Sequence, residues 1–258
     1  MIPSSCAVCG LRAKNVLCEP CRSQFFHAKV YRCVCCALPL SFAPVVETSP
    51  VCGTCLSNPP AFDATLVATD YQAPIDQLVL GLKFGGRLAL APLFGDLLRD
   101  AVLSSQAVPN FADAHSRASS DAHSRTSSDA HSRTSSLPSC LIPVPLSATR
   151  LQQRGFNQSL EISRPLAVHL GVPVLARSME RVRDTRPQSA LPVNARRQNT
   201  RDAFIVRAES VKLIAGRHVG VVDDVMTTGE TLQEIATTLK RFGATRVTNM
   251  VFARTLPR

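Results

Sequence analysis

Two acidic residues and a threonine-rich turn stand together near the C-terminus. Residues 221–231 read VVDDVMTTGET, so a pair of valines is followed by Asp223 and Asp224 and then by a turn with three Thr and one Gly. Backbone N–H groups at a helix start, with Thr hydroxyls and a permissive Gly, form a cradle for an anion such as phosphate. Neighbouring carboxylates suit sugar hydroxyls, or Mg²⁺ that carries a diphosphate. The spacing therefore predicts a site for a phosphorylated sugar.

An apolar strand and an amphipathic helix are expected on either side of this turn. Residues 218–222 (HVGVV) are typical of a buried strand, and residues 230–242 place their apolar side chains on one helical face, ending before Gly243. Ligands of open α/β sheets bind at the carboxyl ends of strands, where this order places both carboxylates. The alternative is a capped helix without a ligand, with Thr228 as the N-cap. The coincidence of strand, carboxylates, turn and helix favours the binding site.

Eight of the ten cysteines form four CxxC pairs: Cys6 and Cys9, Cys18 and Cys21, Cys33 and Cys36, and Cys52 and Cys55. Two pairs supply the four sulfur ligands of a tetrahedral zinc ion, so four pairs predict two structural zinc sites. We expect the pairs to combine in sequence order rather than interleaved. Disulfides are disfavoured in a reducing compartment, and the spacing fits neither ferredoxin pattern. Cys35 and Cys140 are expected as small buried residues, with Cys35 as an alternative ligand.

Strands alternate with helices along the rest of the chain, which is typical of a parallel α/β sheet. The expected strands are residues 64–71, 140–144, 172–175, 218–222 and 247–252, and the expected helices are residues 74–82, 88–103, 157–170 and 230–242. Pro74 is expected at the first position of its helix, whereas Pro165 is expected to kink or divide the helix that contains it.

Changes in composition divide the chain. Residues 1–56 form a cysteine-rich module, and the Pro-Pro pair that follows marks a linker, so residues 57–258 are predicted to form a second domain. Within this domain, an insertion at residues 106–137 contains three copies of DAHSR(A/T)SS, which lack Val, Ile, Leu and Phe. Such a segment cannot bury a core, and one His in every eight residues makes a poor metal site. We therefore expect a disordered loop expansion.

The chain carries a net charge of +10, much of it in one stretch, because residues 150–217 hold thirteen Arg or Lys against five Asp or Glu. A polyanion, either a nucleic acid or a small molecule with several phosphates, is an expected partner. The alternative is a general preference for Arg, which outnumbers Lys 24 to 5. Trp is absent and aromatic residues make up 5%, which argues against a stacking platform for single-stranded nucleic acid.

The first residues lack the basic and apolar regions of a signal peptide. The uncharged stretches fall short of the roughly 20 apolar residues that a membrane helix needs. We therefore expect no membrane insertion and a cytoplasmic location, where thiols stay reduced.

The segment 221–231 resembles the ribose 5-phosphate loop of type I phosphoribosyltransferases, and nearly the whole chain apart from the repeat resembles the ComF/GntX family. The shared features are the N-terminal Cys ribbon, Leu82-Lys83-Phe84 with Gly86, RLQQRGFNQ at 150–158, and Gln188, Leu191, Arg196, Asn199 and Phe204. The resemblance implies a type I phosphoribosyltransferase-like parallel sheet flanked by helices, behind a small N-terminal Cys-rich zinc ribbon.

The resemblance also implies a ligand, phosphoribosyl pyrophosphate (PRPP) bound with Mg²⁺. Asp223 and Asp224 would hold the ribose 2′- and 3′-hydroxyls. The residues around the 5-phosphate would be Thr227, Thr228, Gly229 and Thr231. Glu230, at the helix start, would also belong to the PRPP site, where its charge suits the helix dipole but slightly disfavours a nearby phosphate. The cations for the pyrophosphate side would be Lys83, Arg150, Arg154 and Arg196. Lys83 and Arg154 are the candidates for a catalytic role, and no general base is identifiable. For a single Arg, the alternative is a solvated surface position.

Three functions are consistent with these residues. The first is an enzyme, a phosphoribosyltransferase that transfers the pentosyl group of PRPP to an acceptor that the sequence does not identify. The second is a non-catalytic PRPP-binding protein that binds single-stranded DNA through residues 150–217 and serves DNA uptake with other uptake proteins. The third is an adaptor that acts through the zinc ribbon. We expect a ComF-like PRPP-binding protein in DNA uptake, because the resemblance implies a role in competence.

Overall fold

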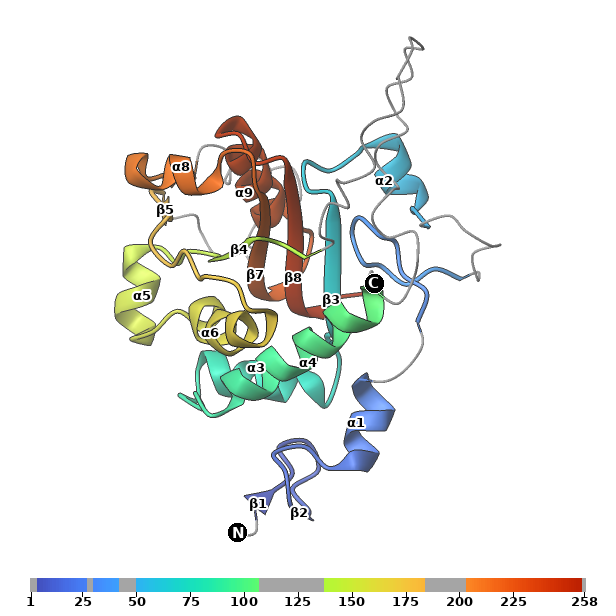
Figure 1. Cartoon of the computed structure of the whole chain (residues 1–258). Coiled ribbons are helices and arrows are strands. Elements are labelled where there is room, and N and C mark those ends of the chain that lie inside the picture. Colours follow the sequence, from blue (N-terminus) through green and yellow to red (C-terminus); the bar gives the residue numbers. More distant parts are fainter. Residues whose placement is uncertain (1–3, 27–29, 42–49, 107–136, 184–202, 257–258) are drawn as a thin grey trace.

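The computed structural model describes residues 4–26, 30–41, 50–106, 137–183 and 203–256. At its centre lies a parallel sheet of four strands (Figure 1). In spatial order the strands are β3 (Ala64–Asp70), β8 (Arg246–Arg254), β7 (His218–Met226) and β4 (Cys140–Pro143). The two inner strands are apolar and buried along most of their length because helices cover both faces of the sheet.

Helices pack on both faces of the sheet. α4 (Leu90–Gln106) and α6 (Gln158–Leu170) cover one face with α3 (Ile75–Lys83) beside them, and α9 (Glu230–Arg241) covers the other (Figure 1). Successive side chains of a strand point to opposite faces. In β7, Val222 therefore joins the apolar cluster of α3, α4 and α6, whereas Val221 joins that of α9.

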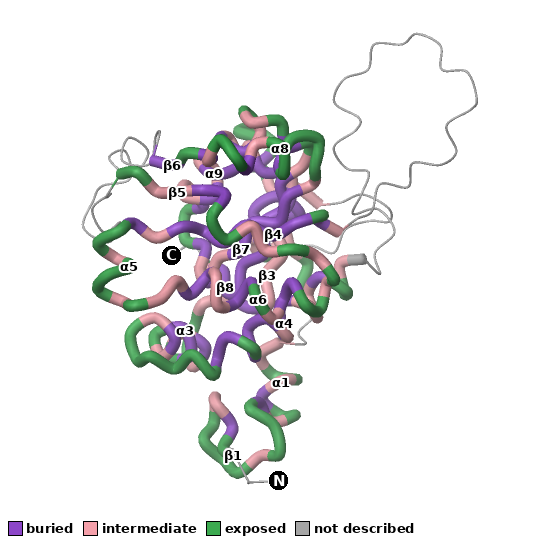
Figure 2. The backbone as a smooth tube through the Cα atoms, turned by 60° about the vertical axis from the view of Figure 1, so that its left-hand side comes forward, coloured by how far each residue is buried: buried purple, intermediate pink, exposed green. Residues whose placement is uncertain are grey.

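Shorter elements surround this core. The N-terminal part contains β1 (Ser4–Ser5), β2 (Arg12–Ala13), α1 (Glu19–Phe26) and α2 (Gly53–Ser57). Later in the chain come α5 (Ala148–Arg154), the antiparallel pair β5 (Met179–Arg181) and β6 (Phe204–Val206), a 3₁₀ turn (Ala208–Ser210) and α8 (Val211–Ile214). The region of β1 and β2 projects from the body and is largely exposed, whereas β4, β7 and β8 of the sheet are mostly buried (Figure 2).

The structure confirms the predicted parallel sheet with flanking helices and corrects some details. Pro74 is the N-cap of α3 rather than its first residue. α6 stays one helix although Pro165 lies inside it. The Pro165 ring packs directly against Gly95 of α4. A Cβ at Gly95 would come within 2.8 Å of Pro165 Cγ, so only glycine leaves room for the ring. This close packing of α4 and α6 supports the helix across the missing backbone donor.

The prediction of a strand at residues 172–175 is wrong, because this segment does not form a strand of the sheet. Only Val174 pairs with β4, through an isolated parallel bridge to Leu141. The Leu141 N–H donates to the Pro173 carbonyl at 2.9 Å, and the Leu141 carbonyl accepts from the Leu175 N–H at 2.8 Å. Pro173 has no N–H with which to continue the ladder, which limits the pairing to this bridge.

Some predictions fall outside the described residues. The octapeptide repeats belong to residues 107–136, and the family positions Gln188, Leu191, Arg196 and Asn199 belong to residues 184–202. None of the helices in the described ranges has both the length and the apolar content of a membrane span. The division between residues 56 and 57 stays a prediction.

Candidate functional site

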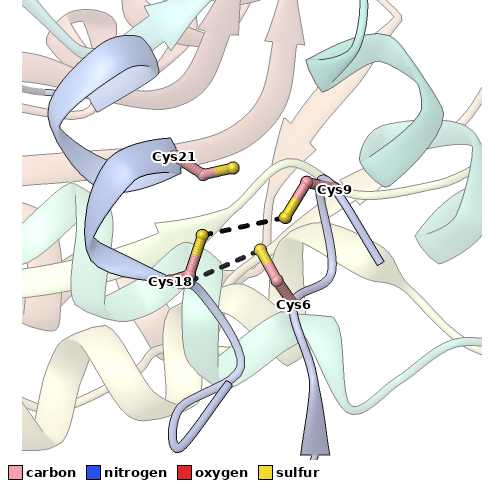
Figure 3. A group of neighbouring side chains, drawn as sticks. All are labelled: Cys6, Cys9, Cys18 and Cys21. Carbon is pink, nitrogen blue, oxygen red and sulfur yellow. Dashed lines mark hydrogen bonds between the residues drawn. The ribbon is translucent and has the colours of Figure 1, made fainter. Parts of the chain in front are cut away.

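The eight predicted zinc ligands form two separate clusters. The sulfur atoms of Cys6, Cys9, Cys18 and Cys21 lie within 4.8 Å of one another, and so do those of Cys33, Cys36, Cys52 and Cys55. In the first cluster the four side chains point toward a common centre (Figure 3). The sequential pairing of the CxxC motifs is thereby confirmed, and neither Cys35 nor Cys140 belongs to these groups of four.

The spacing of the sulfur atoms fits a tetrahedral ion. Four sulfurs at the ~2.3 Å Zn–S distance occupy corners ~3.8 Å apart. The distance between Cys9 Sγ and Cys18 Sγ is 3.8 Å, and that between Cys36 Sγ and Cys52 Sγ is 3.7 Å. In addition, the Cys52 backbone N–H donates to Cys33 Sγ at 3.3 Å, a bond that stabilises a thiolate. The residues present therefore fit structural zinc in both clusters.

The turn between β7 and α9 is built around Gly229. This residue is the N-cap of α9, so the alternative with Thr228 as the N-cap is wrong. Its φ of +86° is left-handed, and an added Cβ would lie 2.6 Å from Met226 Cε, which explains why glycine stands here. Thr227 and Thr228 are exposed. Their hydroxyls and backbone are therefore accessible at a helix start, where the dipole favours an anion.

A cavity of about 800 Å³ opens beside this turn, at the carboxyl ends of β4 and β7. Its volume lies within the range of small-molecule sites. Ten of the residues predicted to bind PRPP contribute to its lining: Lys83, Arg150, Arg154, Asp223, Asp224, Thr227, Thr228, Gly229, Glu230 and Thr231. The fold thus brings together the end of α3, the helix α5 and the turn after β7, which are far apart in the sequence.

The acidic pair, of which Asp224 is buried and Asp223 partly buried, lies beside a lysine. Asp224 is 2% exposed, and its Oδ2 lies 3.1 Å from Lys83 Nζ. Asp223 Oδ1 accepts hydrogen bonds from Ser159 Oγ at 3.0 Å and from the Asp224 backbone N–H at 2.9 Å. Burial, followed by the charge of Asp224, raises the pKa of Asp223 to about 7. A cation or a set of hydroxyl donors that approaches the pair would therefore stabilise the ionised carboxylate.

Arg154 reaches the cavity as the last residue of α5, as Lys83 does from the end of α3. It donates to Gln158 Oε1 at 2.5 Å, and its guanidinium lies 5.2 Å from the centre of the Phe84 ring. Burial lowers the pKa of Arg154, but a guanidinium remains charged at neutral pH. The Arg154 guanidinium is therefore a fixed positive charge in the cavity that can contact an anionic ligand.

The RGFNQ motif forms the corner between α5 and α6. Gly155 ends α5 with a left-handed φ of +77°. Asn157 caps α6 by accepting from Ser159 N–H at 2.9 Å, and its amide donates to the Val144 carbonyl at 3.0 Å, just beyond β4. Because Ser159 in turn donates to Asp223, the corner fixes α5 relative to both the sheet and the acidic pair.

Comparison with known proteins assigns the chain to a family. The family model of the phosphoribosyl transferase domain matches residues 157–256. DNA utilization protein YhgH of Salmonella typhimurium is 31% identical over 258 residues, which cover 99% of this chain and 99% of that protein. Competence protein F of Haemophilus influenzae is 31% identical over 235 residues, which cover 91% of this chain and 89% of that protein. The chain belongs to the ComF/GntX family.

In this ComF/GntX chain, three further side chains shape the site. Ser159 holds Asp223, Arg181 on β5 lines the cavity, and Arg254 at the end of β8 donates to backbone carbonyls of the turn. The position of Ser159 directly after the RGFNQ motif was a usable signal. No local pattern marks Arg181 or Arg254, because their contacts arise only when the strands are assembled.

Proposed function

We propose that this cavity binds PRPP together with Mg²⁺. The observation that carries the proposal is that ten residues predicted from the sequence to bind PRPP line one cavity of about 800 Å³. They supply three kinds of group: a helix start for a phosphate, two adjacent carboxylates, and cations from two other helices. PRPP, with phosphate groups on two sides of a ribose, needs all three.

Each group has a role in this proposal. The Thr227–Thr228–Gly229 turn accepts the 5-phosphate, and Asp223 and Asp224 accept hydrogen bonds from the ribose hydroxyls. Lys83, Arg150 and Arg154 face the pyrophosphate. Carboxylate and phosphate oxygens are the ligands that Mg²⁺ prefers, so the donor set fits this ion, which would neutralise part of the pyrophosphate charge.

Transfer of the phosphoribosyl group is the reaction that such a complex favours. The bond between ribose C1 and the pyrophosphate oxygen breaks, the oxygen keeps the electron pair, and an acceptor nucleophile bonds to C1. Lys83 and Arg154 would stabilise the charge that develops on the departing pyrophosphate. Pyrophosphate release with candidate acceptors tests turnover. Bound PRPP without release would indicate a binding protein instead.

The proposed cellular role is DNA uptake and utilisation in the cytoplasm. Two relatives that align over most of the chain are named a DNA utilization protein and a competence protein. Single-stranded DNA and DNA-uptake proteins are the proposed partners. Counterion release makes contacts with DNA phosphates strongly salt-dependent. DNA binding that weakens steeply between low and physiological salt would support this role, and binding that is insensitive to salt would contradict it.

Calorimetric titration of Mg²⁺ and PRPP into the zinc-loaded full chain tests the binding proposal. We expect wild type to bind, and the double variant Asp223→Asn/Asp224→Asn to lose at least about tenfold in affinity. Asparagine keeps the size of aspartate but removes the charge. Glu209→Gln is the matched control, because Glu209 lies outside the cavity and is paired with Arg207. Absence of binding by folded wild type would contradict the proposal.

A further inference from the structure

Arg254 lies between the second Cys cluster (Cys33, Cys36, Cys52 and Cys55) and the turn after β7. It is the last residue of β8 and only 5% exposed. Its Nε donates to the Cys36 carbonyl at 3.0 Å, and its Nη1 donates to the Met226 carbonyl at 3.0 Å and to the Thr227 carbonyl. One guanidinium therefore connects the backbone of a zinc-binding knuckle to the backbone of the anion-binding turn.

These bonds orient the amides of the turn. In a trans peptide the C=O and the following N–H lie in one plane and point in opposite directions. When the carbonyls of Met226 and Thr227 point to Arg254, the N–H groups of Thr227 and Thr228 must point away from it. Within the described residues these two N–H groups donate to no protein acceptor. They are thus available to a phosphate, in an orientation that Arg254 maintains.

The knuckle at the other end of Arg254 is itself fixed to the sheet. Thr65 N–H on β3 donates to the Val34 carbonyl at 2.9 Å. Arg32 donates to the Ala37 carbonyl at 3.1 Å and pairs with Asp70 at 2.8 Å. The Cys36 carbonyl is therefore a rigid anchor for Arg254 as long as the cluster keeps the knuckle folded.

The cluster also contributes electrostatically. Among the described residues no carboxylate forms an ion pair with Arg254, since Asp70 pairs with Arg32 instead. A zinc ion with four thiolate ligands carries a net charge of about −2. A loaded second cluster therefore supplies the negative charge that a buried guanidinium requires.

We propose that Arg254 is a positioning residue that couples zinc in the second Cys cluster to phosphate binding by the turn. The identity of the phosphate ligand as PRPP rests on the proposed function. Loss of zinc loosens the Cys36 knuckle, Arg254 loses its anchor, and the amides of Thr227 and Thr228 lose their fixed direction. Coupling of equilibrium affinities is reciprocal, so Mg²⁺ with PRPP also raises the affinity of this cluster for zinc, and a chelator removes less zinc from it at equilibrium.

A double-mutant cycle tests the coupling through Mg²⁺–PRPP affinity. Arg254→Lys keeps the charge, but a single ammonium group cannot contact both the Cys36 carbonyl and the carbonyls of the turn. We therefore expect about a tenfold weaker affinity for Mg²⁺–PRPP. Cys52→Ser is expected to weaken affinity similarly, and the two changes together are expected to lose no more than either alone. Arg22→Lys, which alters the contact of α1 with Asp100 at the first cluster, is the control. Losses from Arg254→Lys and Cys52→Ser that multiply would overturn the proposal.

Hydrogen exchange of residues 226–231 provides a readout that needs no PRPP. We expect exchange there to rise at least about threefold in Cys52→Ser and to stay at the wild-type rate in Cys18→Ser, the equivalent position of the first cluster. Unchanged exchange in Cys52→Ser would overturn the coupling even if PRPP binds. Failure of wild type to bind PRPP, with exchange raised as expected, would contradict the proposed ligand and leave the coupling intact.

Discussion

The two Cys clusters have the same ligands but pack against different parts of the apolar core. The first cluster lies in the projecting N-terminal region, where Cys9 is exposed but Cys6 and Cys21 are buried and join the apolar cluster of α3, α4 and α6. An Arg22–Asp100 ion pair of 2.9 Å adds a polar contact between α1 and α4 (Figure 1). In the second cluster, Cys33 is 1% exposed and shares an apolar cluster with Val221 of β7. The first cluster thus lies at the margin of the apolar core, whereas the second packs beside the strand that leads to the candidate site.

The difference shows how one metal chemistry can serve two purposes. A zinc site in a small projecting segment supplies the stability that such a segment cannot obtain from apolar burial. A zinc site packed on a sheet also fixes neighbouring backbone, here the Cys36 carbonyl that Arg254 contacts. The composition-based division after residue 56 separates the second cluster from the sheet in sequence, while its packing joins the two in space.

The largest expected difference between the clusters is in global stability. Cys33→Ser should lower the free energy of unfolding of the sheet by at least about 3 kcal/mol, because it removes a ligand from a metal site within the core. Cys9→Ser should change it by less than about 1 kcal/mol, since Cys9 is exposed and lies outside the apolar core. Urea unfolding followed by circular dichroism measures both. Equal losses would show that the clusters are equivalent parts of one core.

Gly229 tests the turn that the second cluster supports. Gly229→Ala places a side chain at a φ of +86°, where a Cβ would lie 2.6 Å from Met226 Cε. We expect about a tenfold loss of Mg²⁺–PRPP affinity with little loss of helix content. Gly53→Ala, next to the second cluster, is the control, since a Cβ there meets nothing within 4 Å. An unchanged affinity in Gly229→Ala would show that the turn is not the phosphate site.

The pH dependence of PRPP binding separates the acidic pair from the clusters. The pKa of Asp223 is raised to about 7 in the free protein, so its neutral form predominates at pH 6. Its contribution to stability is present at low pH and is lost as the pH rises through about 7. Binding needs the ionised carboxylate, so affinity should rise about tenfold from pH 6 to pH 8.

Calorimetry at several pH values measures this rise, and buffers with different ionisation heats report the released proton. Cys18→Ser should keep the same profile because the first cluster does not contact Asp223. A flat profile in wild type would contradict the role of Asp223.

The smallest expected effect concerns the tether of the first cluster. The Arg22–Asp100 pair joins side chains that are 25% and 32% exposed. Arg22→Ala should therefore lower the free energy of unfolding by no more than about 1 kcal/mol, while hydrogen exchange in α1 increases. Arg164→Ala, which removes an exposed pair with Glu161, serves as the control. A larger loss in Arg22→Ala would mean that the first cluster is as integral as the second.

The main elements of the fold could be predicted because their signals are local. The apolar run of β7 and the one-sided face of α9 are visible in the sequence, as are the CxxC pairs. β7 continues through Asp223 and Asp224 to Met226, beyond the predicted end at residue 222. The polar residues Asp223 and Asp224 do not indicate a buried strand in the sequence. The strand continues through them because it pairs with β8 as far as Met226. The short β5 and β6 were missed because three residues show no period.

The site residues that belong to a sequence motif could be predicted. Those that reach the site only through the register of the parallel strands could not. Asp223 to Thr231 could be chosen from strand, turn and helix signals. Arg254 could not, because it meets the turn only through the parallel register that pairs it with Met226. The capping of α9 by Gly229 instead of Thr228 depends on the left-handed backbone of the turn, which residue preferences at helix starts do not reveal.

A crystal structure of the zinc-loaded full chain with PRPP and Mg²⁺ is the most direct test. We predict the 5-phosphate at the N–H groups of Thr227 and Thr228, the ribose hydroxyls at Asp223 and Asp224, and the pyrophosphate toward Lys83 and Arg154. Anomalous scattering at the zinc edge should show one ion in each Cys cluster. An empty cavity at saturating PRPP, or a ligand whose phosphates avoid the turn, would contradict a PRPP site at the end of β7.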